Sequence, residues 1–138
     1  MLPVGADVVA VVALGGAVGS VARWAIEAAW PARPGRLPWA TLVINVSGCA
    51  LLGALVVLVL AVSPPSRYLR PALGTGVLGG FTTFSTAMLE SHALLGRGAV
   101  LVAGSYLLVS VALGLIGVWL GTVVARGLLR LTPRAPQG

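Results

Sequence analysis

The sequence reads Gly79-Gly80-Phe81-Thr82-Thr83-Phe84-Ser85-Thr86 in the middle of its third apolar run. Four glycines at positions 74, 76, 79 and 80 precede the two threonines, and such a composition has poor helix propensity. Adjacent glycines can open a helix and free backbone carbonyls, and non-helical backbone is tolerated at membrane depth only inside protein or beside water. Carbonyls that point inward form a hard oxygen cage suited to a small cation. A packing kink without an ion fits the same spacing equally well.

The composition of the chain indicates a membrane protein. Of its 138 residues, 58% are hydrophobic and only 9% are charged, which is too little charge to cover a soluble globule of this size. The nine basic residues are all arginines, and most lie near the ends of apolar runs, as expected of segments that stop at lipid headgroups. A nucleic-acid-binding protein would gather them in one patch, whereas here they are spread one or two per loop.

The apolar residues divide into four runs, each long enough to cross a bilayer as a helix of about 20 residues. Prolines, glycines and arginines separate these runs. We therefore predict an all-α integral membrane protein with four transmembrane helices, the third broken near its middle. Residues 1–138 would form a single membrane domain with spans at about 8–30, 39–62, 68–95 and 99–126, and residues 127–138 are expected to form a disordered tail.

The arginines orient such a protein only weakly. An even number of spans puts both termini on one side, and that side carries the arginines at positions 67, 70, 126, 130 and 134, against 33, 36 and 97 on the other. The bias favours cytoplasmic termini. It is small enough to permit insertion in both orientations as well.

Small residues recur four positions apart, a spacing that lets helix backbones approach closely in lipid. Because four helices have few ways to enclose a pore alone, these faces suggest an oligomer, most simply a dimer. Packing within one chain explains any single pair equally well. The pairs are Gly15 with Gly19, Gly16 with Ser20, Cys49 with Gly53, Ser110 with Gly114, and Gly117 with Gly121.

Polar side chains deep in a span need a partner or a wet cavity. Asn45 shares a helical face with Thr41 in the second span, and the two form a polar stripe. Tyr106 and Ser110 form a hydroxyl-bearing face in the fourth span, although a single serine in a membrane helix usually bonds its own i−4 carbonyl. The positive edge of the Phe84 ring can meet a partly dehydrated anion, but aromatic rings more often serve as hydrophobic bulk.

Arg23 and Glu90 are ionisable residues toward the ends of spans. Each can line a vestibule, but Arg23 can also snorkel to the interface beside Glu27, one turn later, so a structural role is equally open. Glu90 and His92 are two residues apart, face different ways on a helix and lack a third group for a catalytic triad. We therefore expect no enzyme activity.

Four motifs together resemble one family, the CrcB or Fluc fluoride channels of bacteria. They match in order over almost the whole chain, and the third motif is highly specific. The motifs are Gly15-Gly16-x-x-Gly19-Ser20-x-x-Arg23-Trp24, Thr41-Leu42-x-x-Asn45-x-x-Gly48, Gly79-Gly80-Phe81-Thr82-Thr83-Phe84-Ser85-Thr86, and Glu90.

The resemblance implies a passive, fluoride-selective channel in the bacterial inner membrane that exports fluoride and lowers its cytoplasmic concentration. It implies a dimer of antiparallel subunits with two pores and a structural, activating sodium ion (Na+) at the centre. The backbone carbonyls of Gly79 and Thr82 would hold this sodium. The implied fluoride pathway consists of Asn45, Thr83, Phe84, Ser85, Tyr106 and Ser110, with Glu90 and Arg23 as vestibule or structural residues.

Two places depart from the family pattern. Ala87 stands where a second pore phenylalanine usually follows, and Gly114, with Val118 a turn later, stands where the track of hydroxyls usually continues. Each pore of the family draws on both subunits, so these losses can leave one of two pores incomplete. A heterodimer with a paired homologous subunit and a homodimer therefore both remain compatible with the sequence.

Two other functions are compatible with the residues. A small four-span exporter of drugs or organic cations would need a carboxylate deep in a span, whereas Glu27 and Glu90 both lie toward span ends. A non-conducting membrane assembly subunit would need only the glycine faces. ATP drive is not expected, because the chain has no lysine and no Gly-rich loop ending in Lys-Ser/Thr.

Overall fold

The computed structural model describes residues 5–61 and 66–131, and every regular element in these two ranges is helical. The all-α class is therefore confirmed for this part of the chain. The elements are α1 (Ala6–Ala29), α2 (Trp39–Ala61), η1 (Pro71–Leu78), α3 (Gly79–Phe81), α4 (Phe84–Gly96) and α5 (Val100–Leu131). η1 is a stretch of wider π-helix.

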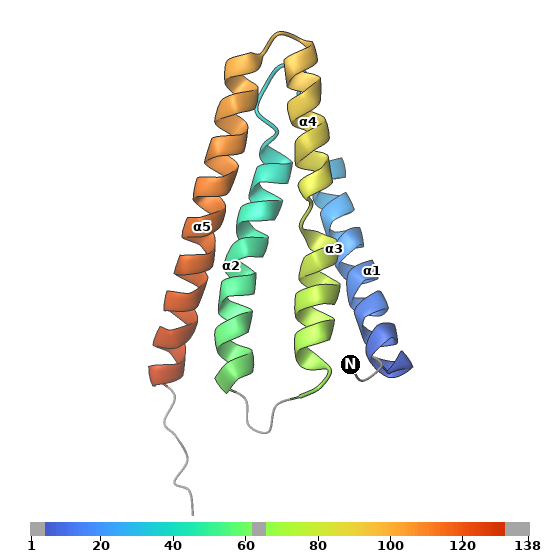
Figure 1. Ribbon diagram of the computed structural model, residues 1–138, viewed down its shortest axis with the longest axis vertical. Helices are drawn as coiled ribbons and strands as arrows, with labels where there is room; N and C mark the ends of the chain where they lie inside the picture. The colour runs from blue at the N-terminus through green and yellow to red at the C-terminus, as the bar shows by residue number, and fades with distance from the viewer. Residues whose placement is uncertain (1–4, 62–65, 132–138) are drawn as a thin grey trace, which may run out of the picture.

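The helices stand side by side in an elongated bundle (Figure 1). α2 packs mainly against α5, α1 packs against η1 and α3, and α4 contacts α5. α1, α2 and α5 are each long and apolar enough to cross a membrane. α1 begins and α5 ends at the same end of the bundle (Figure 1).

The small-residue faces contact neighbouring helices of the same chain. A Cβ atom at Gly19 would collide with the backbone carbonyl of Val77 in η1, and a Cβ atom at Gly121 would collide with the carbonyl of Ala50 in α2. Only glycine permits so close an approach at these two positions. Packing within one chain therefore explains both faces, and they supply no argument for an oligomer.

The third apolar run is broken at Thr82 and Thr83, inside the stretch where the sequence predicts an interruption. The backbone is extended there, with φ −78° and ψ 154° at Thr82 and φ −147° and ψ 118° at Thr83. The prediction that the adjacent glycines open the helix is wrong, because Gly79 and Gly80 are helical residues of α3. The break begins two residues after Gly80, at Thr82.

These glycines instead allow the third run to pack closely on α1. A Cβ atom at Gly80 would collide with the carbonyl of Gly16, and one at Gly76 would lie 2.9 Å from the carbonyl of Val12. Packing thus compensates for the low helix propensity of glycine, as tertiary context often does.

α5 is longer than predicted. It continues through residues 127–131, which the sequence assigned to a disordered tail beginning after Arg126. These residues include three leucines and no proline, so nothing in them ends the helix. The rest of the predicted tail, residues 132–138, and the predicted end of the second span at residue 62 lie outside the described ranges.

A polar cluster joins the start of α1 to the segment before η1. The Tyr68 hydroxyl donates to Asp7 Oδ2 at 2.7 Å, and Arg67 Nη2 lies 2.8 Å from the same oxygen. The Arg67 guanidinium also lies over the Tyr68 ring, 5.0 Å from its centroid. All three side chains are exposed, so the cluster mainly fixes geometry and adds little stability.

Candidate ion pathway

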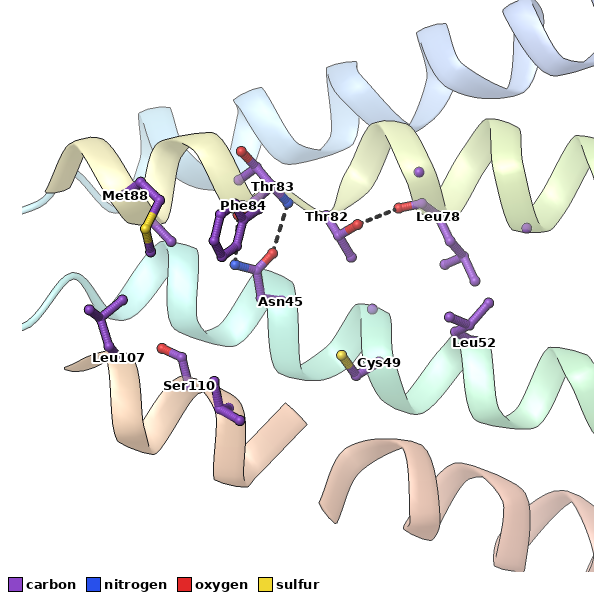
Figure 2. A pocket seen from close by; sticks show the side chains of 15 residues that line it. Asn45, Cys49, Leu52, Leu78, Thr82, Thr83, Phe84, Met88, Leu107 and Ser110 are labelled. Carbon is purple, nitrogen blue, oxygen red and sulfur yellow. Dashed lines mark hydrogen bonds between the residues drawn. The ribbon is translucent and has the colours of Figure 1, made fainter. Parts of the chain in front are cut away.

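An open groove of about 370 Å³ lies between α2, α5 and the broken third run (Figure 2). Every residue that lines it is uncharged, so an ion inside would interact with backbone and side-chain dipoles. Six of the ten predicted site residues line the groove. They are Asn45, Gly79, Thr82, Thr83, Phe84 and Ser110, whereas Arg23, Ser85, Glu90 and Tyr106 lie outside its lining.

Asn45 holds the broken backbone from the side of α2. Its Oδ1 accepts from the Thr83 N–H, and its Nδ2 donates to the Thr83 carbonyl, each at 2.8 Å (Figure 2). In a continuous helix that N–H would donate to the carbonyl of Gly79, four residues earlier. Asn45 therefore replaces the lost partner and leaves the Gly79 carbonyl without its usual donor.

The hydroxyl of Thr83 caps the helix that restarts after the break. It accepts from the Thr86 N–H at 3.1 Å and donates to Thr86 Oγ1 at 2.9 Å. Ser85 Oγ lies 3.3 Å from the same oxygen. Because Thr83 donates its one hydroxyl proton to Thr86, Ser85 must be the donor in its contact with Thr83. Thr83 thus begins α4 as a conventional N-cap residue.

Arg23 holds the break from the side of α1. Its Nε donates to the Gly80 carbonyl at 3.2 Å, and the Ser20 hydroxyl lies 3.5 Å from the same oxygen. A continuous helix would direct the Phe84 N–H to this carbonyl. The predicted shielding by Glu27 is confirmed, with 3.7 Å between Arg23 Nη1 and Glu27 Oε1. These contacts fit the structural one of the two roles predicted for Arg23, and the vestibule role stays a prediction.

Phe84 is not part of the core of this chain. Its side chain is 77% exposed, and it stands at the edge of the groove beside Asn45 (Figure 2). Hydrophobic bulk inside the chain, the commoner role of an aromatic ring, does not apply to it. The ring is free to face whatever enters or covers the groove.

Glu90 joins three helices instead of standing free at a span end. Thr41 Oγ1 on α2 donates to its Oε1 at 2.8 Å, and the Tyr106 hydroxyl on α5 donates to its Oε2 at 2.9 Å. Thr41 and Tyr106 are both fully buried at 0% exposure. Hydrogen bonds to a carboxylate are stronger than neutral ones, so this network stabilises the junction of α2, α4 and α5.

The predicted track of hydroxyls on α5 is directed into the protein. The Tyr106 hydroxyl bonds Glu90, and the Ser110 hydroxyl donates to the Tyr106 carbonyl at 2.6 Å. The local alternative for Ser110 is thus confirmed, although Ser110 also lines the groove. Thr41 was not predicted as a partner of Glu90, because its spacing in the sequence places it on one helical face with Asn45.

The two departures from the family pattern lie inside the chain. Ala87 is 5% exposed and packs in the core cluster with Leu42 and Tyr106. Gly114 is buried, and a Cβ atom there would lie 3.4 Å from Cys49 Sγ. Ala87 also lines the groove, whereas Gly114 lies outside its lining.

A bundle of apolar helices, three of them long enough to cross a membrane, with a broken helix beside an uncharged groove defines a helical membrane protein. A family model described as CrcB-like protein, Camphor Resistance (CrcB) matches residues 10–122. The chain belongs to this family, and the resemblance read from its four motifs is confirmed.

Relatives of the chain carry names that specify an ion. The chain is 48% identical over 124 residues to the fluoride-specific ion channel FluC 2 of Nocardia farcinica, covering 90% of this chain and 89% of that protein. It is 45% identical to FluC 1 of Streptomyces coelicolor, covering 91% and 81% respectively. It is 44% identical to FluC 1 of Mycobacterium tuberculosis, covering 85% and 89%.

Proposed function

We propose that this protein is a passive, fluoride-selective ion channel of the bacterial inner membrane that lets fluoride leave the cytoplasm. The observation that carries the proposal is the match over most of the chain to relatives named fluoride-specific ion channels. The uncharged groove supports it, because a passive pore needs ion contacts weak enough to release the ion. Neither the exporter nor the non-conducting assembly subunit is favoured by the names of these relatives.

Asn45 and Phe84 are the anion contacts in this proposal. The Asn45 amide has two N–H groups, and its hydrogen bond to the Thr83 carbonyl uses one of them. The second can donate to an anion in the groove. The Phe84 ring presents a positive edge at the same place, and its exposure leaves that edge accessible.

The four predicted pathway hydroxyls already have partners and would contribute only after rotation; they belong to Thr83, Ser85, Tyr106 and Ser110. Thr83 donates to Thr86 and accepts from two groups, which uses its proton and both lone pairs. Ser110 donates to the Tyr106 carbonyl. A passing fluoride would have to compete with these partners. Each hydroxyl would then turn from its present acceptor in the protein and donate to the fluoride instead.

The proposal makes the third run a fourth span. The segment from Pro71 to Gly96 exceeds the roughly 20 residues that a bilayer requires. Its break is compatible with membrane depth because Asn45 and Arg23 provide partners for the freed backbone groups.

We propose a dimer of antiparallel subunits, because the groove is open and Phe84 lacks a cover in this chain. A second subunit on that side would turn the groove into an enclosed path. The partner is either an identical chain or a paired homologue. Relatives named FluC 2 and FluC 3 in one strain of Streptomyces avermitilis support the paired form.

The structural sodium would be held by the carbonyls of Gly79 and Thr82. The residues fit such an ion, since Thr83 directs its N–H to Asn45 and so leaves the Gly79 carbonyl available. Thr82 is extended, which removes its own carbonyl from the helical pattern. Bound sodium would neutralise the carbonyl dipoles at the break, as hard cations prefer oxygen ligands.

Fluoride efflux from liposomes tests the proposed function. The purified chain is reconstituted in vesicles loaded with potassium fluoride, and release is followed with a fluoride electrode after valinomycin clamps the potential. We expect rapid fluoride release and no chloride release from matched vesicles. Absence of fluoride release, with the chain alone and with a paired subunit, would refute the function. Full conduction by the chain alone would show that no second type of subunit is required.

A further inference from the structure

The acidic side chains of this protein are all engaged, and two neighbouring arginines have none of them as a partner in the part of the chain that the structure describes. The chain has three acidic residues. Asp7 pairs with Arg67, Glu27 with Arg23, and Glu90 with two hydroxyl groups. No acidic side chain therefore remains, within the described residues, to pair with the arginines at positions 33 and 36, between α1 and α2.

A tight turn holds these two arginines together. The Arg36 N–H donates to the Arg33 carbonyl at 3.1 Å, and Gly35 has a φ of +72°. Pro34 at the second position and a glycine with positive φ at the third are the signature of a type II turn. Such a turn keeps the Cα atoms of its first and last residues within about 7 Å, so Arg33 and Arg36 are presented as a pair.

The arginine pair lies in a hollow flanked by two tryptophans. A cavity of about 230 Å³ is lined by Arg33, Arg36, Trp30 and Trp39, together with smaller residues of the loop. The tryptophan side chains are 49% and 54% exposed. They stand at the end of α1 and the start of α2, both long enough to cross a membrane. Exposed tryptophans at such helix ends settle at the level of lipid headgroups.

We propose that this hollow binds the phosphate of an anionic phospholipid headgroup. Two guanidinium groups present planar forks of donors that match phosphate oxygens in a bidentate manner. A lipid is the source that the position favours, because the tryptophans put the turn where headgroups are concentrated. Phosphatidylglycerol fits better than phosphatidylcholine, whose own choline cation offsets the phosphate charge. The site is separate from the groove and does not depend on the proposed fluoride transport.

Native mass spectrometry of the full chain in detergent tests the proposal. Phosphatidylglycerol and phosphatidylcholine are titrated separately, and the apparent Kd of the first bound lipid is measured. We expect Arg33→Gln and Arg36→Gln each to weaken phosphatidylglycerol binding about tenfold, the size expected for a charge-assisted hydrogen bond. Arg97→Gln is the matched control. It removes the same charge from the α4–α5 loop at the same end of the bundle (Figure 1), outside this cavity.

A second variant tests the turn without changing charge. Gly35→Ala keeps both arginines, and the added Cβ atom meets nothing within 4 Å, but the alanine disfavours a φ of +72°. We expect it to weaken phosphatidylglycerol binding while the helical circular dichroism is retained. Binding unchanged by Gly35→Ala would contradict the turn as the site.

Three further outcomes would overturn the proposal. Equal loss with Arg97→Gln would indicate unspecific attraction to charge, and equal affinity for phosphatidylcholine would remove the selectivity that the arginine pair predicts. Displacement of the lipid by an equal concentration of inorganic phosphate would identify free phosphate as the ligand. A headgroup site is supported if Arg97→Gln has the smaller effect, phosphatidylcholine binds more weakly than phosphatidylglycerol, and inorganic phosphate does not displace the lipid.

Discussion

The side-chain amide of Asn45 pairs with both backbone groups of Thr83, accepting from its N–H and donating to its carbonyl across 2.8 Å each. This one side chain on α2 thus replaces the partner that the Thr83 N–H loses where the third run becomes extended. A break of this kind is tolerated in a membrane only while the freed groups are satisfied. The stability of the protein and the shape of its groove therefore depend on the same residue.

Asn45→Leu is expected to destabilise the protein, because it leaves the N–H of Thr83 without its partner. An unsatisfied buried polar group costs about 1–3 kcal/mol, so the melting temperature in detergent should fall clearly. Ser47→Ala is the control, since the Ser47 hydroxyl bonds only the nearby Ile44 carbonyl of the same helix. Equal melting temperatures for the two variants would show that the Asn45 pairing is dispensable.

Tyr106→Phe is expected to lower stability by about 1–3 kcal/mol, because Glu90 Oε2 loses its donor in a partly buried setting. Tyr68→Phe removes a comparable hydroxyl–carboxylate bond at Asp7. That bond is exposed, so water can replace it and the melting temperature should barely change. Thermal denaturation of both variants in one detergent measures the difference, and a larger loss for Tyr68→Phe would contradict the importance of the Glu90 network.

Phe84→Leu is expected to reduce fluoride flux while leaving the fold of the single chain intact. The side chain is 77% exposed, so its truncation opens no cavity in the core, but the positive ring edge is lost. An aromatic contact of this kind is worth up to about tenfold in rate. Leu101→Ala, which trims a side chain with 89% exposure, serves as the control in the liposome assay. Flux that is insensitive to Phe84→Leu would remove the ring from the ion path.

Gly121→Ala is expected to destabilise the packing of α5 on α2 by about 1–3 kcal/mol, the usual cost of overpacking. Its Cβ atom would collide with the backbone carbonyl of Ala50, which cannot move as a side chain can. Gly127→Ala on the same helix meets nothing within 4 Å and should be neutral or slightly stabilising, because alanine favours helix. Thermal denaturation distinguishes the two variants. Similar melting temperatures for Gly121→Ala and Gly127→Ala would contradict the close contact between α5 and the backbone of α2 at Gly121.

Much of the fold could be read from the sequence, since the apolar runs correspond to α1, α2, α5 and the interrupted third run. The position of the break could be narrowed only to a stretch of eight residues. Low helix propensity pointed to Gly79 and Gly80, whereas close packing on α1 keeps them helical and the break falls at Thr82 and Thr83. Propensity is a local quantity, and packing against a distant helix outweighed it.

The polar residues of the site were also identifiable, but their partners were not. Asn45 and Arg23 stand out as polar groups in apolar spans, yet they bond backbone groups 38 and 57 residues away. No periodicity in the sequence encodes such pairs, because they depend on how three helices pack. Glu90 was similarly expected as a vestibule or structural residue, and its donors on two other helices could not be read from the sequence.

The two side chains that bond the backbone at the break are also synthesised before it. Arg23 and Asn45 belong to α1 and α2, which leave the ribosome before the segment that they support. Chains form from the N-terminus onward, so both supports are synthesised ahead of the residues that would otherwise expose bare peptide groups to lipid. A circular permutant beginning at η1 would reverse this sequence of events, because the break would then be synthesised before α1 and α2. It should insert poorly even though every contact of the finished bundle remains available.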